Sequence, residues 1–229
     1  FTAGIYPMDI LLTVDRSGSM SDELSYIANS LGDFLDVLAT SGVDYRIPAT
    51  TQIDGRHEPG ELWIDEGPSN KAALGLFQAM ISETPSSKVV HHGLLRAQNA
   101  LSAEHVEPGG CNEGFRRDGA MLHIVGVSND ADTSPYKKTP LEYLYVQQEG
   151  VKFPLEVVYH GVGAEMNCGD AGVYEGFLDV TSATLGMWVS ICDDKWWTQL
   201  AGLANWMLER VDRRTYILAD QPLETTLTV

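Results

Sequence analysis

Oxygen-bearing side chains gather at two places in the sequence, and each place directly follows an apolar stretch. Residues 15–19 read DRSGS and follow the apolar run MDILLTV at 8–14. Residues 128–132 read SNDAD and follow the apolar run AMLHIVGV at 120–127. Carboxylates and hydroxyls are hard donors, which suit cations such as Mg²⁺ better than soft metals. The two stretches therefore predict a site for a hard cation, provided that the fold brings them together.

The elements around these stretches are those of a layered α/β protein. Each apolar run is nearly continuous, which is typical of a strand covered on both faces. After the first polar turn, apolar residues recur at helical spacing over 22–39, with Ser21 as the expected N-cap and Gly42 as the end. In an open parallel sheet, ligands bind at the carboxyl ends of strands where the strand order reverses. Two neighbouring strands would bring both polar turns to that point.

The rest of the chain repeats the alternation of strands and helices. We expect further strands over 43–51, 61–65, 153–159 and 188–191, and helices over 71–81, 92–101, 140–148, 173–181 and 193–211. Two alternating segments, 215–219 and 225–229, predict a C-terminal β-hairpin joined near Pro222. This order predicts a mostly parallel central sheet flanked by helices. No linker divides the chain, so we expect a single domain over residues 1–229.

One segment carries a resemblance to a known family. DILLTVDRSGSM, at residues 9–20, resembles the opening of a von Willebrand factor type A domain, and its D-x-S-x-S pattern matches the first loop of the metal-ion-dependent adhesion site. The resemblance continues, in the order found in bacterial secreted or surface-anchored members, through VDYRIPATT, HHGLLRAQNALS, NEGFRRDGAMLHIVGVSNDADTS and SICDDKWWTQLAGLA. It implies a three-layer Rossmann-like fold with Mg²⁺, or in some members Mn²⁺ or Ca²⁺, at the top of the sheet. It also implies that a partner's carboxylate completes the coordination.

The resemblance implies a set of metal ligands. Asp15, Ser17 and Ser19 match the first loop of the family site. In the third loop, the position of the family's aspartate is held by Asn129, and two acidic residues follow it closely. We take Asp130 as the acidic ligand. Asn129 and Asp132 are the alternatives at this loop, and an Asn offers a carbonyl oxygen without charge.

The second loop departs from the family pattern. Many members place a Thr directly before the helix that matches HHGLLRAQ, whereas this chain has KVVH at 88–91. Adjacent residues on a helix do not face each other, so we interpret His91 and His92 as helix-start or surface residues rather than a metal-binding pair. His123 lies within a buried-strand pattern, and we expect it to be a core histidine.

The three cysteines are too few for a disulfide scaffold, and their spacing alone does not decide between reduced thiols and one bridge. The resemblance implies a Cys168–Cys192 bridge and hence an oxidising compartment. Cys111 would then remain single.

Charge and composition exclude several classes of partner. The chain of 229 residues has 15 Lys and Arg against 32 Asp and Glu, a formal net charge of −17. A protein this acidic repels phosphate backbones and anionic lipid surfaces, so we expect no nucleic-acid partner. No run of about 18 apolar residues is present, so no membrane span is expected. The chain begins with Phe1, which implies processing or excision from a longer protein.

These features lead us to expect a divalent-cation-dependent adhesion or protein-binding domain of a bacterial extracellular, cell-surface or periplasmic protein. The expected partner is a protein that offers an Asp or Glu carboxylate, and self-association is a further expectation. Two alternatives stay open. One is a structural subunit or tip module of a pilus, fibre or coat, and the other is an intracellular type A domain that works with an ATPase. We expect no enzymatic activity, because the chain has no G-x-S-x-G elbow and no His that can be placed beside Ser17 or Ser19.

Overall fold

A parallel sheet forms the centre of the molecule. The computed structural model describes residues 7–57, 63–65, 72, 75, 77, 78, 91–136, 139–148 and 157–220. The strands are β1 (Met8–Val14), β2 (Tyr45–Arg46), β3 (Ala49–Thr50), β4 (Met121–Val127), β5 (Val157–Gly163) and β6 (Trp188–Ser190). They lie in the order β2-β1-β4-β5-β6, β3 pairs with β1, and every pairing is parallel. β1 and β4 are the central pair, and both bear only buried residues.

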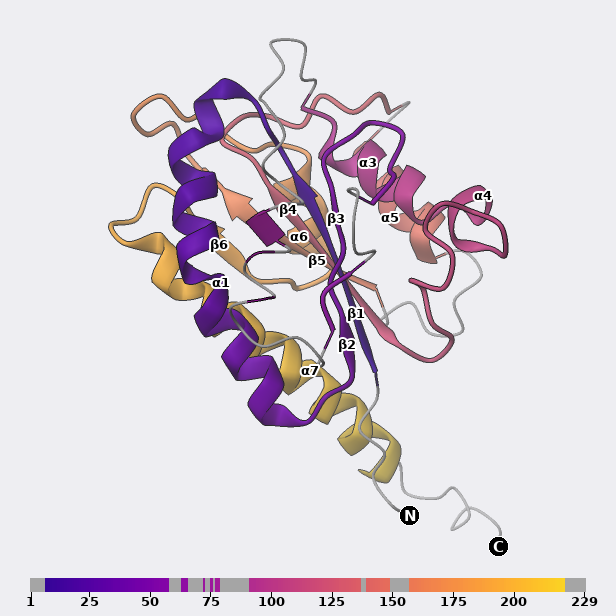
Figure 1. The fold of residues 1–229 in the computed structure, drawn as a ribbon. Helices are drawn as coiled ribbons and strands as arrows, with labels where there is room; N and C mark the ends of the chain where they lie inside the picture. Colours follow the sequence, from indigo (N-terminus) through magenta and orange to yellow (C-terminus); the bar gives the residue numbers. More distant parts are fainter. Residues whose placement is uncertain are drawn as a thin grey trace, which may run out of the picture.

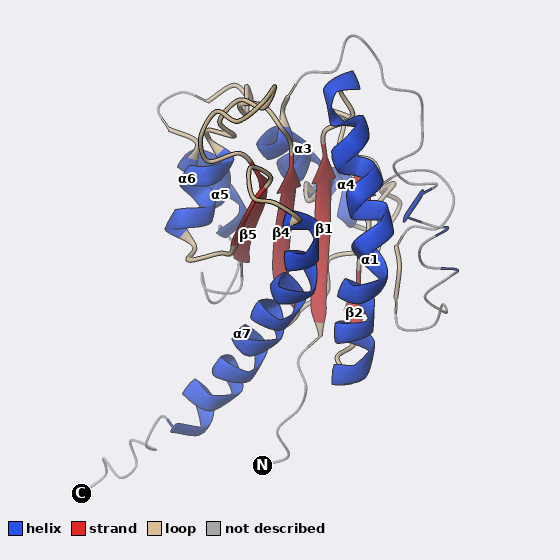
Figure 2. Ribbon diagram, turned by 90° about the vertical axis from the view of Figure 1, so that its left-hand side faces the viewer, coloured by secondary structure: helices blue, strands red, loops and turns tan. Residues whose placement is uncertain are grey.

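Helices cover both faces of this sheet. α1 (Ser21–Ser41) and α7 (Leu200–Asp220) pack together on one face, preceded by the 3₁₀ turns η1 (Gly18–Met20) and η3 (Trp196–Gln199). α3 (Gly93–Ala100), α4 (Ala103–Val106), α5 (Leu141–Gln148) and α6 (Phe177–Ala183) lie on the other side (Figures 1 and 2). The expected three-layer, Rossmann-like α/β architecture is therefore confirmed.

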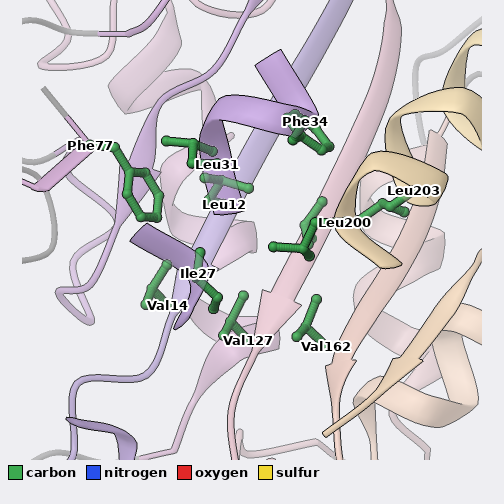
Figure 3. Close-up of a pocket in the computed structure, with 11 residues that line it drawn as sticks. Leu12, Val14, Ile27, Leu31, Phe34, Phe77, Val127, Val162, Leu200 and Leu203 are labelled. Atoms are coloured by element: carbon green, nitrogen blue, oxygen red, sulfur yellow. The ribbon is translucent and has the colours of Figure 1, made fainter. Parts of the chain in front are cut away.

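The two faces of the sheet bury separate apolar clusters, because successive side chains of a strand point to opposite faces. On β1, Ile10, Leu12 and Val14 join the cluster under α1 and α7, whereas Leu11 joins the cluster under α3, α5 and α6. A small cavity of about 40 Å³ remains in the first cluster and is lined only by apolar side chains. Figure 3 shows its walls from β1, β4, β5, α1 and α7.

The expected strand over 43–51 is interrupted, and the expected arm at 61–65 is described only in part. The segment 43–51 forms β2 and β3 as separate pieces, because Pro48 between them has no N–H to donate to the ladder. Its carbonyl still accepts the N–H of Leu12 at 3.0 Å, which keeps the segment beside β1. Of the arm expected at 61–65, only residues 63–65 are described, and there Ile64 forms an antiparallel bridge with Ile47.

The expected terminal hairpin is wrong over residues 215–219. These residues continue α7, which runs to Asp220 and extends past the lower end of the sheet in Figure 2. α7 is anchored by buried side chains that include Leu203 and Met207. Once a helix has nucleated, each further residue is added at little cost, which favours its continuation through 215–219. Residues 225–229 and Pro222 lie outside the described residues. In the part of the chain that is described, no helix combines the length and apolar content of a membrane span.

Other boundaries moved by a few residues. α1 begins at Ser21 itself, and its N-cap is Met20 without a side-chain hydrogen bond, so the expected Ser21 cap is wrong. The expected helix over 173–181 forms as α6 after Gly176, whose φ of 81° favours glycine. Of the expected helix over 71–81, only residues 72, 75, 77 and 78 are described, and they are helical.

His123 is a core histidine, as expected, and it pairs with a second buried histidine. His160 Nδ1 accepts the N–H of Met187 at 3.0 Å, so its proton lies on Nε2. That Nε2–H donates to His123 Nδ1 at 2.9 Å, which places the proton of His123 on its own Nε2. Both rings are fully buried, and Trp206 packs edge-on against His160. The fold therefore holds the pair in its neutral form.

This pair should make the domain less stable in acid. Burial lowers the pKa of His123 to about 3, with the nearby Arg210 as a smaller cause, and burial likewise lowers the pKa of His160. The unfolded chain takes up protons below the ordinary value of 6.5, whereas the folded pair resists them. Stability contributed by the neutral pair is thus present above pH 6.5 and is lost as the pH falls toward 3. Between pH 7 and pH 5 we expect His123 to contribute a loss of about 2 kcal/mol, and His160 should add to it in the same direction.

Urea unfolding at pH 7 and pH 5 measures this loss. A His123→Phe variant should show a smaller fall between the two pH values than the unsubstituted chain, even if it is less stable at both. A matched His105→Phe change, at a residue outside the apolar clusters, should leave the fall unchanged. An equal fall in the His123→Phe variant would show that the pair does not set the acid sensitivity.

Candidate metal centre

The site lies where the strand order reverses, at the carboxyl ends of β1 and β4. These strands pair in register from Met8 opposite Met121 to Val14 opposite Val127, so both end at the same level. The Asp15 N–H then donates to the Val127 carbonyl at 2.9 Å. β1 is flanked by β2 and β3 on one side and by β4 on the other. The two polar turns predicted from the sequence are therefore neighbours.

Asp15 forms the buried floor of the site. Asp15 is 1% exposed, and its Oδ1 accepts the N–H of Ser17 at 2.8 Å. Its Oδ2 accepts the hydroxyl of Ser128 at 2.8 Å and lies 2.6 Å from Nδ1 of His91. Both carboxylate oxygens are thus held in place by groups from three separate loops.

The two first-loop hydroxyls extend from this floor to the third loop. The Ser17 and Ser19 hydroxyls are 2.9 Å apart, and the Ser19 hydroxyl donates to Asn129 Oδ1 at 3.1 Å. The η1 turn brings these serines together, since the Met20 N–H bonds back to the Ser17 carbonyl at 3.0 Å. The Ser19–Asn129 contact joins residues 110 positions apart. Asn129, one of the alternatives, is therefore the third-loop residue that the structure places with the serines.

The two acidic residues of the third loop have different surroundings. The Asp130 side chain is 56% exposed, and its Oδ2 lies 3.7 Å from His91 Nε2 at the edge of the site. Asp132 is buried and turns away: its Oδ2 accepts the N–H of Leu94 at 3.0 Å, and its Oδ1 accepts the N–H of Ser134 at 2.9 Å. Burial raises the pKa of Asp132, and these hydrogen bonds oppose the rise. Asp132 thus holds the start of α3, whereas Asp130 borders the site.

His91 is the site residue that sequence reasoning missed. It directly precedes α3's N-cap, and its ring lies between Asp15 and Asp130. Its neighbour His92 is the N-cap of α3, as a helix-start residue, and burial lowers its pKa while the charge of Asp132 opposes this shift. His91, by contrast, contacts two carboxylates of the site. The sequence did contain one signal for His91 as a site residue: it stands at the position where the resemblance implies a Thr.

Two buried arginines lie beside the floor. The Arg96 Nη1 donates to the Val14 carbonyl at 3.1 Å, and the Arg16 Nη1 donates to Thr51 Oγ1 at 3.0 Å. Burial lowers the pKa of Arg96, and the charge of Asp15 opposes this shift. The positive charge of Arg96 therefore acts on the buried carboxylate of Asp15 and partly offsets its negative charge.

The donor set fits a partly hydrated divalent cation. In the described part of the chain, no cluster of three or more His, Cys, Asp or Glu side chains could hold a metal ion. An ion at this place would therefore depend on hydroxyl, amide and water oxygens beside the Asp15 carboxylate. Mg²⁺ is commonly held in this way, by one or two carboxylates with several retained waters.

The loop after β5 forms a wall beside the third loop, and a disulfide holds it. The Gly172 N–H donates to the Asn129 carbonyl at 2.9 Å. Cys168 of this loop is bridged to Cys192, which follows β6, as the resemblance implied. In the chain-entropy description, a closed loop of this size stabilises the fold by about 3 kcal/mol. Cys111 is exposed and unpaired.

Comparisons with known proteins show the fold. No protein-family model matches the sequence, and no relative is found among curated proteins. Similar solved structures include the pilus adhesin SpaC from Lactobacillus rhamnosus GG in its open conformation, with a TM-score of 0.53, 12% identity, and coverage of 91% of this chain and 31% of that chain. Proximal thread matrix protein 1 from the mussel byssus has a TM-score of 0.50 and 14% identity, with 89% and 46% covered.

An aerotolerance-related membrane protein from Bacteroides fragilis NCTC 9343 has a TM-score of 0.50 and 9% identity, with 89% of this chain and 99% of that chain covered. This chain spans about a third to a half of the length of the adhesin and the thread matrix protein. At these identities the likeness establishes a shared α/β fold.

Proposed function

We propose that this chain is a non-enzymatic, divalent-cation-dependent binding domain of an extracellular or cell-surface bacterial protein. The observation that carries the proposal is the hydrogen bond from Ser19 to Asn129, which joins the first and third loops directly above the buried Asp15. The resemblance of these loops to the metal-ion-dependent adhesion site supports the same reading. So does the likeness of the fold to that of a pilus adhesin.

Each residue has a distinct part in this proposal. Asp15, Ser17, Ser19 and Asn129 would hold the cation, and the exposed carboxylate of Asp130 would lie at its edge. The bound cation supplies a positive centre that attracts a carboxylate of the partner protein. One metal–ligand bond gives little specificity, so the surface around the loops would select the partner.

The proposed location follows from the disulfide. Bridges persist in oxidising environments and are rare in the cytosol, so the Cys168–Cys192 pair favours a secreted or surface protein over an intracellular partner of an ATPase. That the domain has no enzymatic activity is part of the same proposal. A serine nucleophile needs a base within hydrogen-bond reach, and both ring nitrogens of His91 face carboxylates.

Binding of a carboxylate probe tests the proposal. In NMR spectra of the Mg²⁺-loaded domain, a short peptide with one central Glu should shift the amide signals of Ser17, Ser19 and Asn129. The same peptide with Gln should not shift them, and EDTA should abolish the Glu effect. Equal shifts in EDTA, or with the Gln peptide, would rule out capture of a carboxylate by the cation.

A structural subunit or tip module of a pilus, fibre or coat stays the alternative. Its basis in a terminal hairpin is weakened, because residues 215–219 are helical. The exposed thiol of Cys111 is the feature that could join subunits. Light scattering of the NMR samples would favour this alternative if the domain forms oligomers that a reductant disperses.

A further inference from the structure

The surface around the candidate metal centre is acidic. Exposed carboxylates follow the carboxyl ends of β4, β5 and β6 and stand in the first turn of α1, namely Asp22, Asp130, Glu165, Asp170, Asp193 and Asp194. Lys195 is an exposed cation in the same region. A partner that brought only a carboxylate to the centre would be repelled by these charges, since like charges facing each other across an interface are unfavourable. A fitting partner therefore carries positive charge beside its carboxylate.

A stacked pair of aromatic rings lies between α1 and η3. The ring centroids of Tyr26 and Trp197 are 4.2 Å apart, and their planes differ by only 10°. Trp196, which is 4% exposed, lies edge-on to both rings and joins the pair to the core. Tyr26 is nevertheless 40% exposed. Because Trp197 covers one face of the Tyr26 ring, a ligand would approach this firmly held ring from the other side.

Tyr26 is close enough to the centre for one partner to reach both. α1 begins directly after the serines of the first loop, at the upper end of the sheet in Figure 2. An α-helix rises about 1.5 Å per residue, so Tyr26 lies about 8 Å along α1 from Ser21. An extended segment of a partner rises about 3.3 Å per residue and covers this distance with a few residues. Such a segment can place one side chain on the cation and another on Tyr26.

Carboxylates stand beside the Tyr26 ring. Residues three and four apart on a helix are neighbours, so Glu23 and the exposed Asp22 lie on the same side of α1 as Tyr26. Burial raises the pKa of Glu23, its own backbone N–H opposes the rise, and the charge of Asp22 adds to it. An aromatic face with carboxylates next to it attracts a cation through the ring quadrupole and through charge. Arginine suits this place best, because its planar guanidinium stacks on a ring and still donates N–H groups to a carboxylate.

We propose that Tyr26, backed by Trp197 and flanked by Asp22, is a second contact site of this domain and takes an arginine side chain of the partner protein. The partner then presents a basic residue a short distance from the acidic residue that meets the cation. The inference rests on the proposed function, because it names the chemistry of the partner at the same face of the domain.

Two peptides of equal composition test the inference. The spaced peptide has a central Glu with an Arg four positions before it and another four positions after it, so either chain direction brings an Arg to Tyr26. The compact peptide has both Arg residues directly beside the Glu. It has the same net charge, and so the same long-range attraction to this acidic domain, but its Arg side chains are too close to the Glu to reach Tyr26. Isothermal titration of the Mg²⁺-loaded domain gives both dissociation constants.

We expect the spaced peptide to bind about 5-fold more tightly than the compact peptide. Tyr26→Leu and Asp22→Asn should each reduce this ratio to less than about 2-fold. The matched controls are Tyr145→Leu, at an exposed tyrosine of α5, and Asp33→Asn, at an exposed aspartate further along α1. Both controls should keep the ratio. As a second readout, NMR should show the Arg methylene signals of the spaced peptide moving upfield on binding, as protons above an aromatic ring do.

The possible failures are distinguishable. Equal affinities for the two peptides, or an unchanged ratio in Tyr26→Leu, would overturn the contact site and leave the proposed function standing. The same titrations in EDTA test the proposed function by itself. If both peptides bind as tightly in EDTA as in Mg²⁺, capture of the carboxylate by the cation fails, whereas a ratio that still depends on Tyr26 keeps the contact site. Binding of neither peptide in Mg²⁺ would contradict both.

Discussion

Replacing Asp15 with Asn should weaken the binding of Mg²⁺ or Mn²⁺ to the domain by at least about 100-fold. The substitution keeps the size of the side chain and removes the one fully buried negative charge among the proposed ligands. Two unit charges about 4 Å apart interact by about 4 kcal/mol near a protein surface, and a dication beside a carboxylate gains more. About 1.4 kcal/mol corresponds to a factor of ten in affinity. The lost attraction of about 4 kcal/mol or more therefore corresponds to a loss of more than 100-fold in affinity.

Isothermal titration of the purified domain with Mn²⁺ measures this effect. The control is Asp132→Asn in the third loop. Asp132 bonds the backbone of Leu94 and Ser134 rather than the serine hydroxyls, so its loss should reduce stability but change Mn²⁺ affinity by no more than about 3-fold. Circular dichroism checks that both variants are folded. Unchanged Mn²⁺ affinity in Asp15→Asn, or a larger loss in Asp132→Asn, would contradict the assignment of the ligands.

Removing the Arg117 side chain should destabilise the fold by about 3–5 kcal/mol without affecting the cation. Asp9 of β1 is buried at the opposite end of the sheet, and its two oxygens accept the N–H and the Nε–H of Arg117, each at 2.8 Å. Burial raises the pKa of Asp9, and Arg117 opposes that rise. The same guanidinium bonds Asp44 at 2.6 Å. An Arg117→Ala change would keep the backbone N–H bond to Asp9 but would leave the buried carboxylate without the guanidinium that pairs with it.

Urea unfolding at pH 7 gives the free energy of unfolding for this comparison. Arg116→Ala, the same change at the neighbouring residue, should cost less than about 1 kcal/mol. The double variant Asp9→Asn, Arg117→Ala should be more stable than Arg117→Ala alone, because it no longer buries a lone charge. A loss of less than about 1 kcal/mol in Arg117→Ala would show that the ion pair is only a surface contact.

The sequence was most informative where one physical signal dominated. β1 and β4 end at Val14 and Val127, as expected, because continuous apolar residues stop there at polar turns. Since these strands are paired in register, their turns had to meet, and Asp15 and Asn129 lie where that argument placed them. Local patterns were enough for this part of the site because both loops start directly at the strand ends.

Other features depend on contacts that no local pattern records. Residues 215–219 alternate like a strand, but an anchored helix already runs through them. His91 meets Asp15 because α3 packs against β1, a contact between residues 76 positions apart. Asp132 was an alternative to Asp130 at this loop, and only the packing of α3 shows that its Oδ2 is engaged with the N–H of Leu94, while its Oδ1 accepts the N–H of Ser134.

Anomalous diffraction from crystals of the domain grown with Mn²⁺ tests the central claim most directly. Our account predicts one strong anomalous peak in the space bounded by Asp15, Ser17, Ser19 and Asn129, within about 2.0–2.6 Å of at least two of their side-chain oxygens. The Asp15→Asn variant, crystallised in the same way, should lose the peak. Crystals of the unsubstituted domain with no peak at these loops, or with the peak elsewhere on the molecule, would contradict the account.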